Sequence, residues 1–447
     1  MKRLIYNEML AWRHQVERKP LLLRGARQVG KTHVIRQLGK TFSQFIEINF
    51  EKTPSFAKIF ELDLDPARII REISLAIDQQ IEPGHTLLFF DEVQQAPTVI
   101  TALRYFYEEM PALHVIAAGS LVDFAIEHVG VPVGRISFLH MYPMSFIEFL
   151  CAKNSKQLAL EIINNKPDHP FSDVIHQKAL RLLGEYMAIG GMPQVVRQWI
   201  SQQDVRACTT LLRDINHAYE QDFSKYANKN EIKYVDFLFK HIPHLICQRF
   251  KYSQLSPDFR KRELEPALWL LQKAGIVNPV IHSSGNGIPL GAEADFQKYK
   301  LITLDVALNQ QILGLDLKDW FIQPEIALIN KGNLSESFIG QELLAYSNSS
   351  DKSQLYYWHN EKKGSHAEVD YLSTHKQAVI PIEVKSGHGA NLQSMRLFLQ
   401  SHPGSPFGIR FSTHPYSILG NLHSYPLYAV SGSLEDKKRL ITFAHSS

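Results

Sequence analysis

The alternation of apolar and polar stretches predicts a layered structure for the first third of the chain. Between Pro20 and about Tyr142, short apolar runs alternate with helical patterns. This alternation is typical of a parallel sheet with helices on both faces. The predicted strands are Leu21 to Leu23, Phe45 to Phe50, Leu87 to Phe90 and Val115 to Ala118, and each is bounded by Gly, Pro or polar turn residues.

The pattern changes after this region. From about Pro143 to Tyr226 it is mostly helical, with a break at the turn Gly190-Gly191-Met192-Pro193. Between residues 230 and 281, three short helical stretches precede an apolar segment, an order that suits a winged-helix module. The last unit begins near Lys331 with a helix and continues with strand-like segments at 354–359, 367–372 and 378–384. A helix followed by a run of strands indicates a separate α+β domain.

Composition narrows the class of protein. A chain of 447 residues is too long for one compact core, and its 45% hydrophobic and 21% charged residues are an ordinary globular balance. The formal charge of +3 is too small to argue for or against nucleic acid. Three scattered cysteines argue against a disulfide framework or a zinc site. Because no apolar run approaches the ~18 residues of a membrane span and no signal peptide is recognisable, we expect a soluble cytoplasmic protein.

One glycine-rich segment has a nucleotide-binding pattern. It reads Gly25-Ala26-Arg27-Gln28-Val29-Gly30-Lys31-Thr32 and lies between the first predicted strand and a predicted helix. Glycines let the backbone wrap a phosphate, and the N–H groups at the helix start favour its negative charge. In this pattern Lys31 reaches the β- and γ-phosphates, and the hydroxyl of Thr32 ligates Mg²⁺. The segment therefore predicts binding of ATP with Mg²⁺.

Polar residues that follow the predicted strands extend this site. Asp91 and Glu92 follow an apolar strand in the form of a Walker B segment. We expect Asp91 to hold Mg²⁺ through water and Glu92 to polarise the attacking water. Ser120 is placed to sense the γ-phosphate, although an ordinary polar turn explains it equally well. Arg135 fits either an arginine finger supplied by a neighbouring subunit or a structural arginine.

Seven short segments, spread over nearly the whole chain, carry a resemblance to a known family. They are Leu23 to Thr32, Phe90 to Gln94, Ala118 to Ser120, Met141 to Phe146, Gly190 to Pro193, Ala274 to Val277 and Leu304 to Leu308. In these segments the chain resembles bacterial and archaeal AAA-type ATPases that carry a C-terminal domain of unknown function. The resemblance implies a P-loop core, a helical and winged-helix middle, and a C-terminal fold similar to restriction endonucleases.

We therefore expect an α/β protein with a P-loop NTPase core and several further units. The expected boundaries are 1–145 for the AAA-type ATPase core, 146–228 for a helical lid, 229–290 for a winged-helix-like module, 291–330 for a connecting region and 331–447 for a PD-(D/E)XK nuclease-like domain. AAA-like proteins often form rings, so a homo-oligomer fits the resemblance.

The last unit contains a candidate nuclease site. Glu368 and Asp370 are followed, one hairpin later, by Glu383 and Lys385. If the two strands pair, alternation brings Asp370, Glu383 and Lys385 to one face, with Glu336 on the preceding helix. This arrangement resembles the PD-(D/E)XK pattern, in which carboxylates hold Mg²⁺ and the lysine stabilises a hydroxide or the phosphate charge. The usual proline-aspartate opening is absent, and a charged, solvated strand face explains the same residues.

These sites leave the function open between two classes. In the first, an ATPase acts on DNA through the nuclease-like domain, and basic residues near Arg249 and Arg260-Lys261-Arg262 contact phosphates. Those basic residues are equally explained as solvated surface. In the second, ATP switches a regulatory protein whose nuclease-like domain is inactive and binds a protein partner. A metabolic kinase is a weaker third hypothesis, because a kinase needs neither the helical middle nor the nuclease-like tail.

Overall fold

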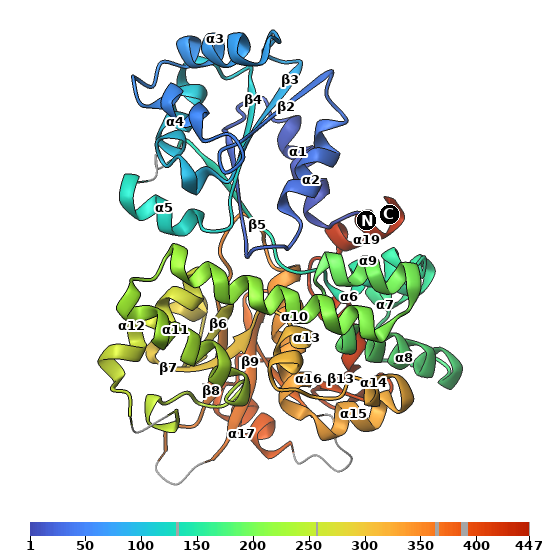
Figure 1. Cartoon of the computed structure of the whole chain (residues 1–447). Helices are drawn as coiled ribbons and strands as arrows, with labels where there is room; N and C mark the ends of the chain where they lie inside the picture. The colour runs from blue at the N-terminus through green and yellow to red at the C-terminus, as the bar shows by residue number, and fades with distance from the viewer. Residues whose placement is uncertain (131–133, 256–257, 363–365, 386–391, 447) are drawn as a thin grey trace.

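The computed structural model describes residues 1–130, 134–255, 258–362, 366–385 and 392–446. Figure 1 shows them as two bodies, which we call the upper body (residues 1–140) and the lower body (residues 141–446). The upper body contains the glycine-rich segment. The lower body contains a second sheet and most of the helices.

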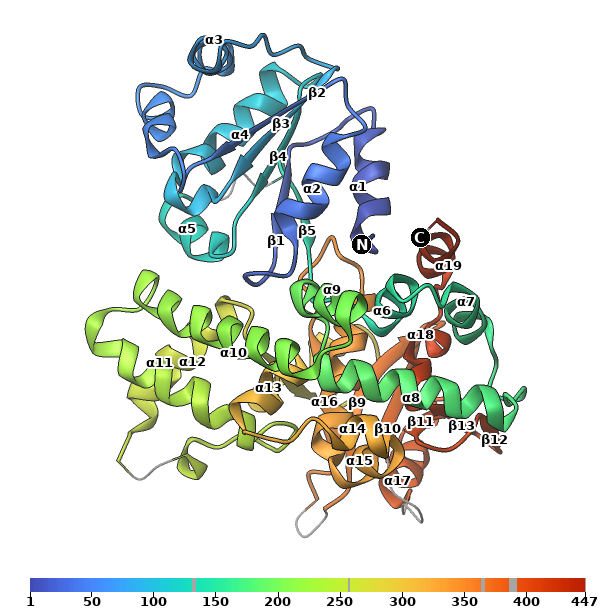
Figure 2. The ribbon, with the colours of Figure 1, turned by 45° about the vertical axis from the view of Figure 1, so that its right-hand side comes forward.

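The upper body is built on a five-stranded parallel sheet with the order β2-β3-β4-β1-β5. Leu21 and Leu23 pack on the face covered by α1 and α2, whereas Leu22 packs on the opposite face, with α3, α4 and α5 (Figure 2). Burial on both faces explains why these strands are continuously apolar. The elements are α1 (Ile5–Arg13), β1 (Leu21–Arg24), α2 (Lys31–Gly39), β2 (Gln44–Asn49), α3 (Pro66–Ile77), β3 (Thr86–Asp91), α4 (Thr98–Glu109), β4 (His114–Ala118), α5 (Val122–Val129) and β5 (Ser137–His140).

The predicted parallel sheet is confirmed, and the four predicted strands correspond to β1, β2, β3 and β4. The sequence analysis missed β5, which is four residues long and pairs with β1 at the edge of the sheet. Its residues Ser137-Phe138-Leu139-His140 contain too few apolar positions to distinguish a strand from a turn.

Helices form the side of the lower body that faces the upper body. They are α6 (Phe146–Ala152), α7 (Lys156–Asn164), α8 (Asp173–Ile189), α9 (Pro193–Gln202) and α10 (Val205–Asp222). In Figures 1 and 2, α9 and α10 lie between the upper body and the second sheet. The lower body also contains α11 (Lys229–His241), α12 (Lys261–Lys273), α13 (Val306–Ile312), α14 (Asp319–Ile322) and α15 (Pro324–Asn330).

The second sheet has eight strands of mixed direction in the order β12-β13-β11-β10-β9-β8-β6-β7. Helix α16 packs on one face, and α17 packs with β9 and β10 through the cluster around Phe398. The elements are β6 (Val277–Ser283), β7 (Ala294–Thr303), α16 (Gly332–Tyr346), β8 (Leu355–His359), β9 (Glu368–His375), β10 (Ala378–Val384), α17 (Gln393–Ser401), β11 (Gly408–Ser412), β12 (Ser417–Leu419), β13 (Leu422–Pro426), α18 (Val430–Ser433) and α19 (Lys438–Ser446).

This sheet crosses the expected domain boundaries. Strand β6 falls within the expected winged-helix-like module at 229–290, and β7 falls within the expected connecting region at 291–330. Both strands pair in the same sheet as β8, which belongs to the expected C-terminal domain. The pairing joins strands more than 70 residues apart, a contact that no local pattern indicates.

The two ends of the chain meet on the lower side of the upper body. Arg439 in α19 forms an ion pair of 2.8 Å with Glu8 in α1, and both figures draw the termini close together. Cys151, Cys208 and Cys247 are buried, and none of them forms a disulfide within the described residues. Within the described residues, every helix is too short or too polar to span a bilayer.

Candidate functional site

The loop between β1 and α2 depends on glycine for its shape. Gly25 and Gly30 have φ angles of 142° and 100°, which residues with a Cβ rarely adopt. A Cβ on Gly25 would also lie 2.2 Å from the carbonyl oxygen of Met141. Gly30 directly precedes α2, so the loop leads into a helix N-terminus, where an anion is favoured. The glycine-rich segment therefore has the strand–loop–helix arrangement that phosphate binding requires.

Lys31 is buried against its own loop. Its ammonium group donates to the carbonyl oxygens of Gly25 and Ala26, both at 2.9 Å. Burial lowers the pKa of Lys31 to about 8, and the charges of Glu92 and Asp91 offset only part of this effect. An anion bound beside this ammonium group would stabilise its charge.

Asp91 ends β3 and faces Thr32 at the start of α2. The Thr32 hydroxyl donates to Asp91 Oδ2 at 3.1 Å, and the Asn49 side-chain amide donates to the same oxygen at 3.2 Å. Burial and the neighbouring charge of Glu92 raise the pKa of Asp91 to about 6. The sequence analysis missed Asn49, although a polar residue at the carboxyl end of a strand beside β3 was a usable signal.

Glu92 and Ser120 lie at the same edge of the sheet. Glu92 has a left-handed backbone with φ of 54°, and the side-chain amide of Gln94 donates to its carboxylate at 2.5 Å. Gly119 makes room for Gln94, because a Cβ there would lie 2.1 Å from the amide oxygen. Glu92 and Ser120 line one pocket together with Lys31. Residues predicted from separate segments therefore meet in one site.

Helix α10 of the lower body contacts the glycine-rich loop through an ion pair and a hydrogen bond. Arg27 in the loop forms an ion pair with Asp222 at the end of α10. The Tyr219 hydroxyl, one turn earlier on α10, donates to the Arg27 carbonyl oxygen at 2.7 Å. Arg197 on α9 lines the same pocket as Lys31. The sequence analysis missed all three partners, because they lie about 170 to 195 residues from the loop.

The turn at Gly190 and Gly191 forms a buried joint with Asp305. Asp305 Oδ2 accepts a hydrogen bond of 2.7 Å from the Gly191 backbone, and its Oδ1 caps α13 at the Ala307 backbone, at 2.9 Å. A Cβ on Gly190 would lie 2.2 Å from Asp305 Oδ1. Two segments that carried the family resemblance therefore meet, and their glycines and carboxylate are explained by close packing.

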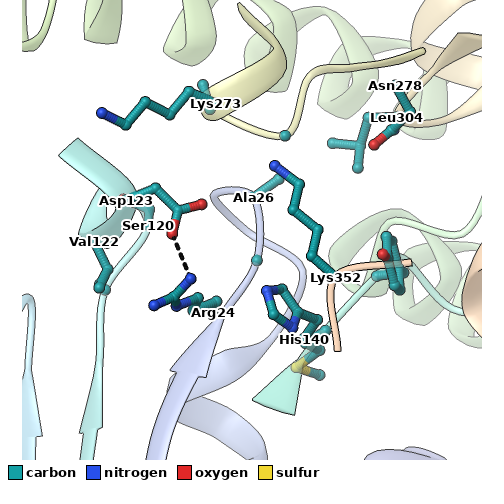
Figure 3. Close-up of a pocket in the computed structure, with 16 residues that line it drawn as sticks. Arg24, Ala26, Ser120, Val122, Asp123, His140, Lys273, Asn278, Leu304 and Lys352 are labelled. Carbon is teal, nitrogen blue, oxygen red and sulfur yellow. Dashed lines mark ion pairs between the residues drawn. The ribbon is translucent and has the colours of Figure 1, made fainter. Parts of the chain in front are cut away.

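A second pocket adjoins the loop at Ala26, where the two bodies meet (Figure 3). The upper body contributes Arg24, which pairs with Asp123 at 3.1 Å. The lower body contributes Lys273 and Lys352, and Lys352 extends toward the loop in Figure 3. Basic side chains from both bodies therefore gather next to the loop.

Of the predicted nuclease residues, Asp370 and Glu383 lie in β9 and β10 of the second sheet, Glu336 lies on α16, and Lys385 directly follows β10. In the pairing of β9 with β10, Ile382 is opposite Tyr371, so Glu383 follows on the strand beside Asp370. Asp370 Oδ2 accepts a 2.7 Å hydrogen bond from the backbone of Val384. The negative charge of Asp370 acts on the pKa of both Glu336 and Glu383. The structure therefore brings the three predicted carboxylates together.

A lysine from β7 occupies the centre of this carboxylate cluster. The ammonium group of Lys300 lies 2.6 Å from Glu336, 3.3 Å from Glu368 and 3.8 Å from Asp370. Lys300 is 0% exposed. Burial by itself would lower the pKa of Lys300, but the three carboxylates reverse the effect and raise it. The sequence analysis missed Lys300, whose only local signal is a charged residue next to the apolar end of a strand.

Burial also shifts the pKa values of the carboxylates themselves. Burial raises the pKa of Glu336 to about 8, with Asp370 adding to the effect and Lys300 opposing it. Burial raises the pKa of Glu383 to about 7, against the charge of Lys385. One carboxylate oxygen of Glu383 is buried without a hydrogen-bond partner in the described structure. Glu383 is thus the member of the cluster with free capacity for a cation or a proton.

Comparison with known protein families identifies the upper body. Residues 17–150 match the family described as an AAA domain, AAA_14. This part of the chain is a P-loop ATPase domain of the AAA type. Residues 180–319 match a domain of unknown function, DUF8612, and residues 331–430 match another, DUF4143. No curated protein matches the chain.

Solved structures resemble the chain at low identity. The Walker-type ATPase PABY2304 of Pyrococcus abyssi is 14% identical with a TM-score of 0.44, and the match covers 69% of this chain and 94% of that one. PCH-2 of C. elegans is 15% identical with a TM-score of 0.23, covering 50% and 61%. The Hsp104–ADP complex of S. cerevisiae is 11% identical with a TM-score of 0.27, covering 77% and 44%.

The geometry of the P-loop fits ATP and Mg²⁺. Gly25 and Gly30 have the positive φ angles with which a backbone can wrap a phosphate, and Lys31 supplies a buried positive charge. The oxygens of Thr32 and Asp91, 3.1 Å apart, are the hard ligands that Mg²⁺ prefers, either directly or through water.

Arg135 lies away from this site within the chain. It precedes β5, whereas the P-loop follows β1, and these two strands are parallel neighbours. Arg135 and the P-loop therefore lie at opposite ends of these strands. Arg135 instead pairs with Glu108 at 2.8 Å, and its side chain is 46% exposed. Contact with a nucleotide would require the P-loop of another subunit.

Proposed function

We propose that this protein is a Mg²⁺-dependent ATPase in which the bound nucleotide changes how the P-loop holds the lower body. The observation that carries the proposal is the ion pair between Arg27, inside the P-loop, and Asp222, at the end of α10. Nucleotide bound in the loop would alter the position or the charge surroundings of Arg27. Asp222 is 5% exposed, so loss of its ion-pair partner would leave a buried charge uncompensated and would destabilise the packing of α10.

Each residue around the loop has a role in this proposal. Lys31 stabilises the phosphate charge, and Thr32 and Asp91 hold the cation. Glu92 orients and polarises the attacking water, and Ser120 contacts the γ-phosphate. Bound ATP with Mg²⁺ supplies the phosphoanhydride bond that is broken. Arg135 acts as an arginine finger only if subunits assemble with its edge of the sheet against a neighbouring P-loop.

For the C-terminal domain, we favour a catalytically inactive, restriction-endonuclease-like unit that binds a protein partner. The support is Lys300, whose ammonium group sits among Glu336, Glu368 and Asp370, where a nuclease would hold its metal. A divalent cation would have to displace a buried lysine that already compensates these charges. The cluster then stabilises the fold and does not cut a phosphodiester.

DNA cleavage is the second candidate, and it has its own support. Glu383 keeps one unpartnered oxygen, and Lys385 lies close enough to lower its pKa. A winged-helix arrangement of α11, α12 and the β6–β7 hairpin would supply the DNA-binding surface. Two of its basic residues are engaged in ion pairs, Arg249 with Glu368 at 3.3 Å and Lys261 with Glu265 at 3.4 Å, which reduces the positive charge available for phosphates.

The first test is an ATPase assay of Lys31→Ala beside Lys40→Ala, a control that removes an exposed lysine from the end of α2. We expect Lys31→Ala to bind ATP about 100-fold more weakly or worse, because a buried charge-assisted contact is lost. The control should bind and hydrolyse ATP as the wild type does. Circular dichroism would check that both variants are folded, and unchanged ATP affinity in folded Lys31→Ala would overturn the proposal.

The same assay, run with and without structured DNA, separates the two candidates for the lower body. With an inactive C-terminal domain, ATP turnover is independent of DNA, and neither wild type nor Glu383→Gln cuts it. If Mg²⁺-dependent cutting is present in the wild type and absent in Glu383→Gln, the nuclease candidate is correct. Lys31→Ala distinguishes cutting that needs ATP from cutting that does not.

A further inference from the structure

Two histidines and a glutamate converge at the edge of the second sheet, outside the sites described above. His282 is in β6, His359 ends β8, and Glu361 lies two residues beyond. One ligand atom from each residue lies within 4.8 Å of the other two. The parallel pairing of β6 with β8 places His282 opposite Tyr357, so His359 is one side-chain position further along the same face. The ring centroids of the two histidines are 4.2 Å apart.

Hydrogen bonding does not explain why a histidine occupies position 282. The residue is 2% exposed, and both ring nitrogens are buried without a hydrogen-bond partner in the described structure. The backbone of His359 interacts with the ring electrostatically, but its geometry is not that of a hydrogen bond. Nδ1 of His359 is also buried and unpartnered. Buried polar atoms without partners are costly, and a ligand that accepts their lone pairs removes the cost.

We propose that His282, His359 and Glu361 bind one Zn²⁺ ion. Two imidazole nitrogens and one carboxylate oxygen are a ligand set that suits Zn²⁺, whereas Mg²⁺ and Ca²⁺ prefer oxygen ligands alone. Ligands around tetrahedral zinc stand about 3.3 Å apart. The three side chains must therefore close by about 1.5 Å at most, and Glu361, whose side chain is 58% exposed, can move to do so. A fourth position is left for water or for a ligand.

Charges of both signs surround the site, with Arg249 and Lys298 opposing a bound cation and Glu361 favouring it. Burial lowers the pKa of His359 to about 4, with nearby His282, Arg249 and Lys298 adding to the effect, so the imidazole is neutral at pH 7. A neutral imidazole is the form that binds metal. Lys298 competes for Glu361, since its ammonium group lies 2.5 Å from Oε1. That contact uses one of the two carboxylate oxygens, and Lys298 also has Asp295 as a partner at 3.1 Å.

The zinc site would adjoin the carboxylate cluster without sharing a residue with it. His359 is opposite Glu368 in the pairing of β8 with β9, and Glu368 contacts Lys300 at 3.3 Å. A cation at the histidines would fix the ends of β6 and β8 relative to each other. It would therefore stabilise the part of the sheet from which Lys300 and Glu368 extend.

The test is a Zn²⁺ titration of the untagged full chain in the presence of millimolar Mg²⁺, followed by competition with a chromogenic chelator. We expect one Zn²⁺ per chain and a higher melting temperature with Zn²⁺. His359→Ala and Glu361→Gln should each weaken binding by about tenfold or more, since a direct ligand is removed. Because Glu361 is exposed, its variant tests the site even if His282→Ala does not fold.

Two controls separate this site from other histidines and carboxylates. His217→Ala removes an exposed histidine that also pairs with a glutamate, Glu220, at 3.0 Å, and Glu220→Gln alters the carboxylate of that pair. Both should bind Zn²⁺ as the wild type does. The proposal is overturned if the wild type binds no stoichiometric Zn²⁺, if His359→Ala and Glu361→Gln bind it unchanged, or if a control loses it equally.

Discussion

Lys31 in the P-loop and Lys300 in the second sheet are both buried lysines, and they differ in what surrounds them. Lys31 donates to two backbone carbonyl oxygens, and burial lowers its pKa to about 8. Lys300 is enclosed by Glu336, Glu368 and Asp370, which outweigh burial and raise its pKa. The charge of the first lysine is poorly compensated by the protein. The charge of the second is fully compensated.

This difference separates a site that awaits a ligand from one that is internally satisfied. Desolvating a charge costs several kcal/mol, and a nearby opposite charge offsets the cost. At Lys31 the missing negative charge would come from the phosphates of a nucleotide. At Lys300 the negative charge comes from carboxylates of the chain, so an incoming phosphate would be repelled by them. A lysine near carboxylates in the sequence therefore does not by itself indicate a phosphate-binding or metal-binding site.

The largest expected effect comes from making the same substitution at both lysines. Lys300→Met removes the positive charge between Glu336 and Asp370, so we expect the free energy of unfolding to fall by about 3 to 5 kcal/mol. Lys31→Met removes a charge that burial already disfavours, so nucleotide-free stability should be unchanged or higher. Urea unfolding at pH 8 without nucleotide measures the stability of both variants. If the two bodies unfold in separate transitions, each variant is compared with the wild type in the transition that its substitution shifts.

The pH dependence of the Lys300→Met loss provides its control. Without the lysine, the buried carboxylates of the folded variant bind protons more readily than those of the unfolded chain. Lowering the pH then stabilises the folded state, so the loss should shrink between pH 8 and pH 5. Equal losses for Lys31→Met and Lys300→Met, or a loss independent of pH, would contradict the comparison.

The contrast also marks what was predictable from the sequence. The P-loop site could be found because Gly25 to Thr32 and Asp91-Glu92 are contiguous motifs at the ends of apolar strands. The contacts of Lys300 with Glu336, of Asp222 with Arg27 and of Asp305 with Gly191 join residues more than 30 positions apart, and local pattern says nothing about such contacts. The same limit hid the pairing of β6 with β8, which unites segments that the sequence analysis assigned to different domains.

The second effect tests whether Lys31 is as weakly compensated as its pKa of about 8 indicates. Phosphate binding favours the protonated lysine, so ATP affinity should be constant below pH 8 and should fall by up to about tenfold per pH unit above it. Fluorescent-nucleotide titrations between pH 7 and pH 9.5 measure this. Lys31→Arg, whose guanidinium stays charged, is the matched control and should show a flat profile at its own affinity. A flat profile in the wild type would mean that Lys31 is compensated like Lys300.

The smallest effect concerns the link between each site and the distant segment that contacts it. The Arg27–Asp222 pair should show a coupling energy of about 0.5 to 1 kcal/mol in a double-mutant cycle of Arg27→Ala and Asp222→Asn, because Arg27 is 36% exposed and solvent screens the pair. If nucleotide changes how the P-loop holds the lower body, this coupling should decrease with a saturating non-hydrolysable ATP analogue. The exposed pair Arg36–Glu47, at 2.7 Å between α2 and β2, is the control and should be insensitive to nucleotide. If nucleotide leaves the Arg27–Asp222 coupling energy unchanged, this contact is as insensitive to nucleotide as the contact of Lys300 with its carboxylates. The proposed switch would then have to lie elsewhere.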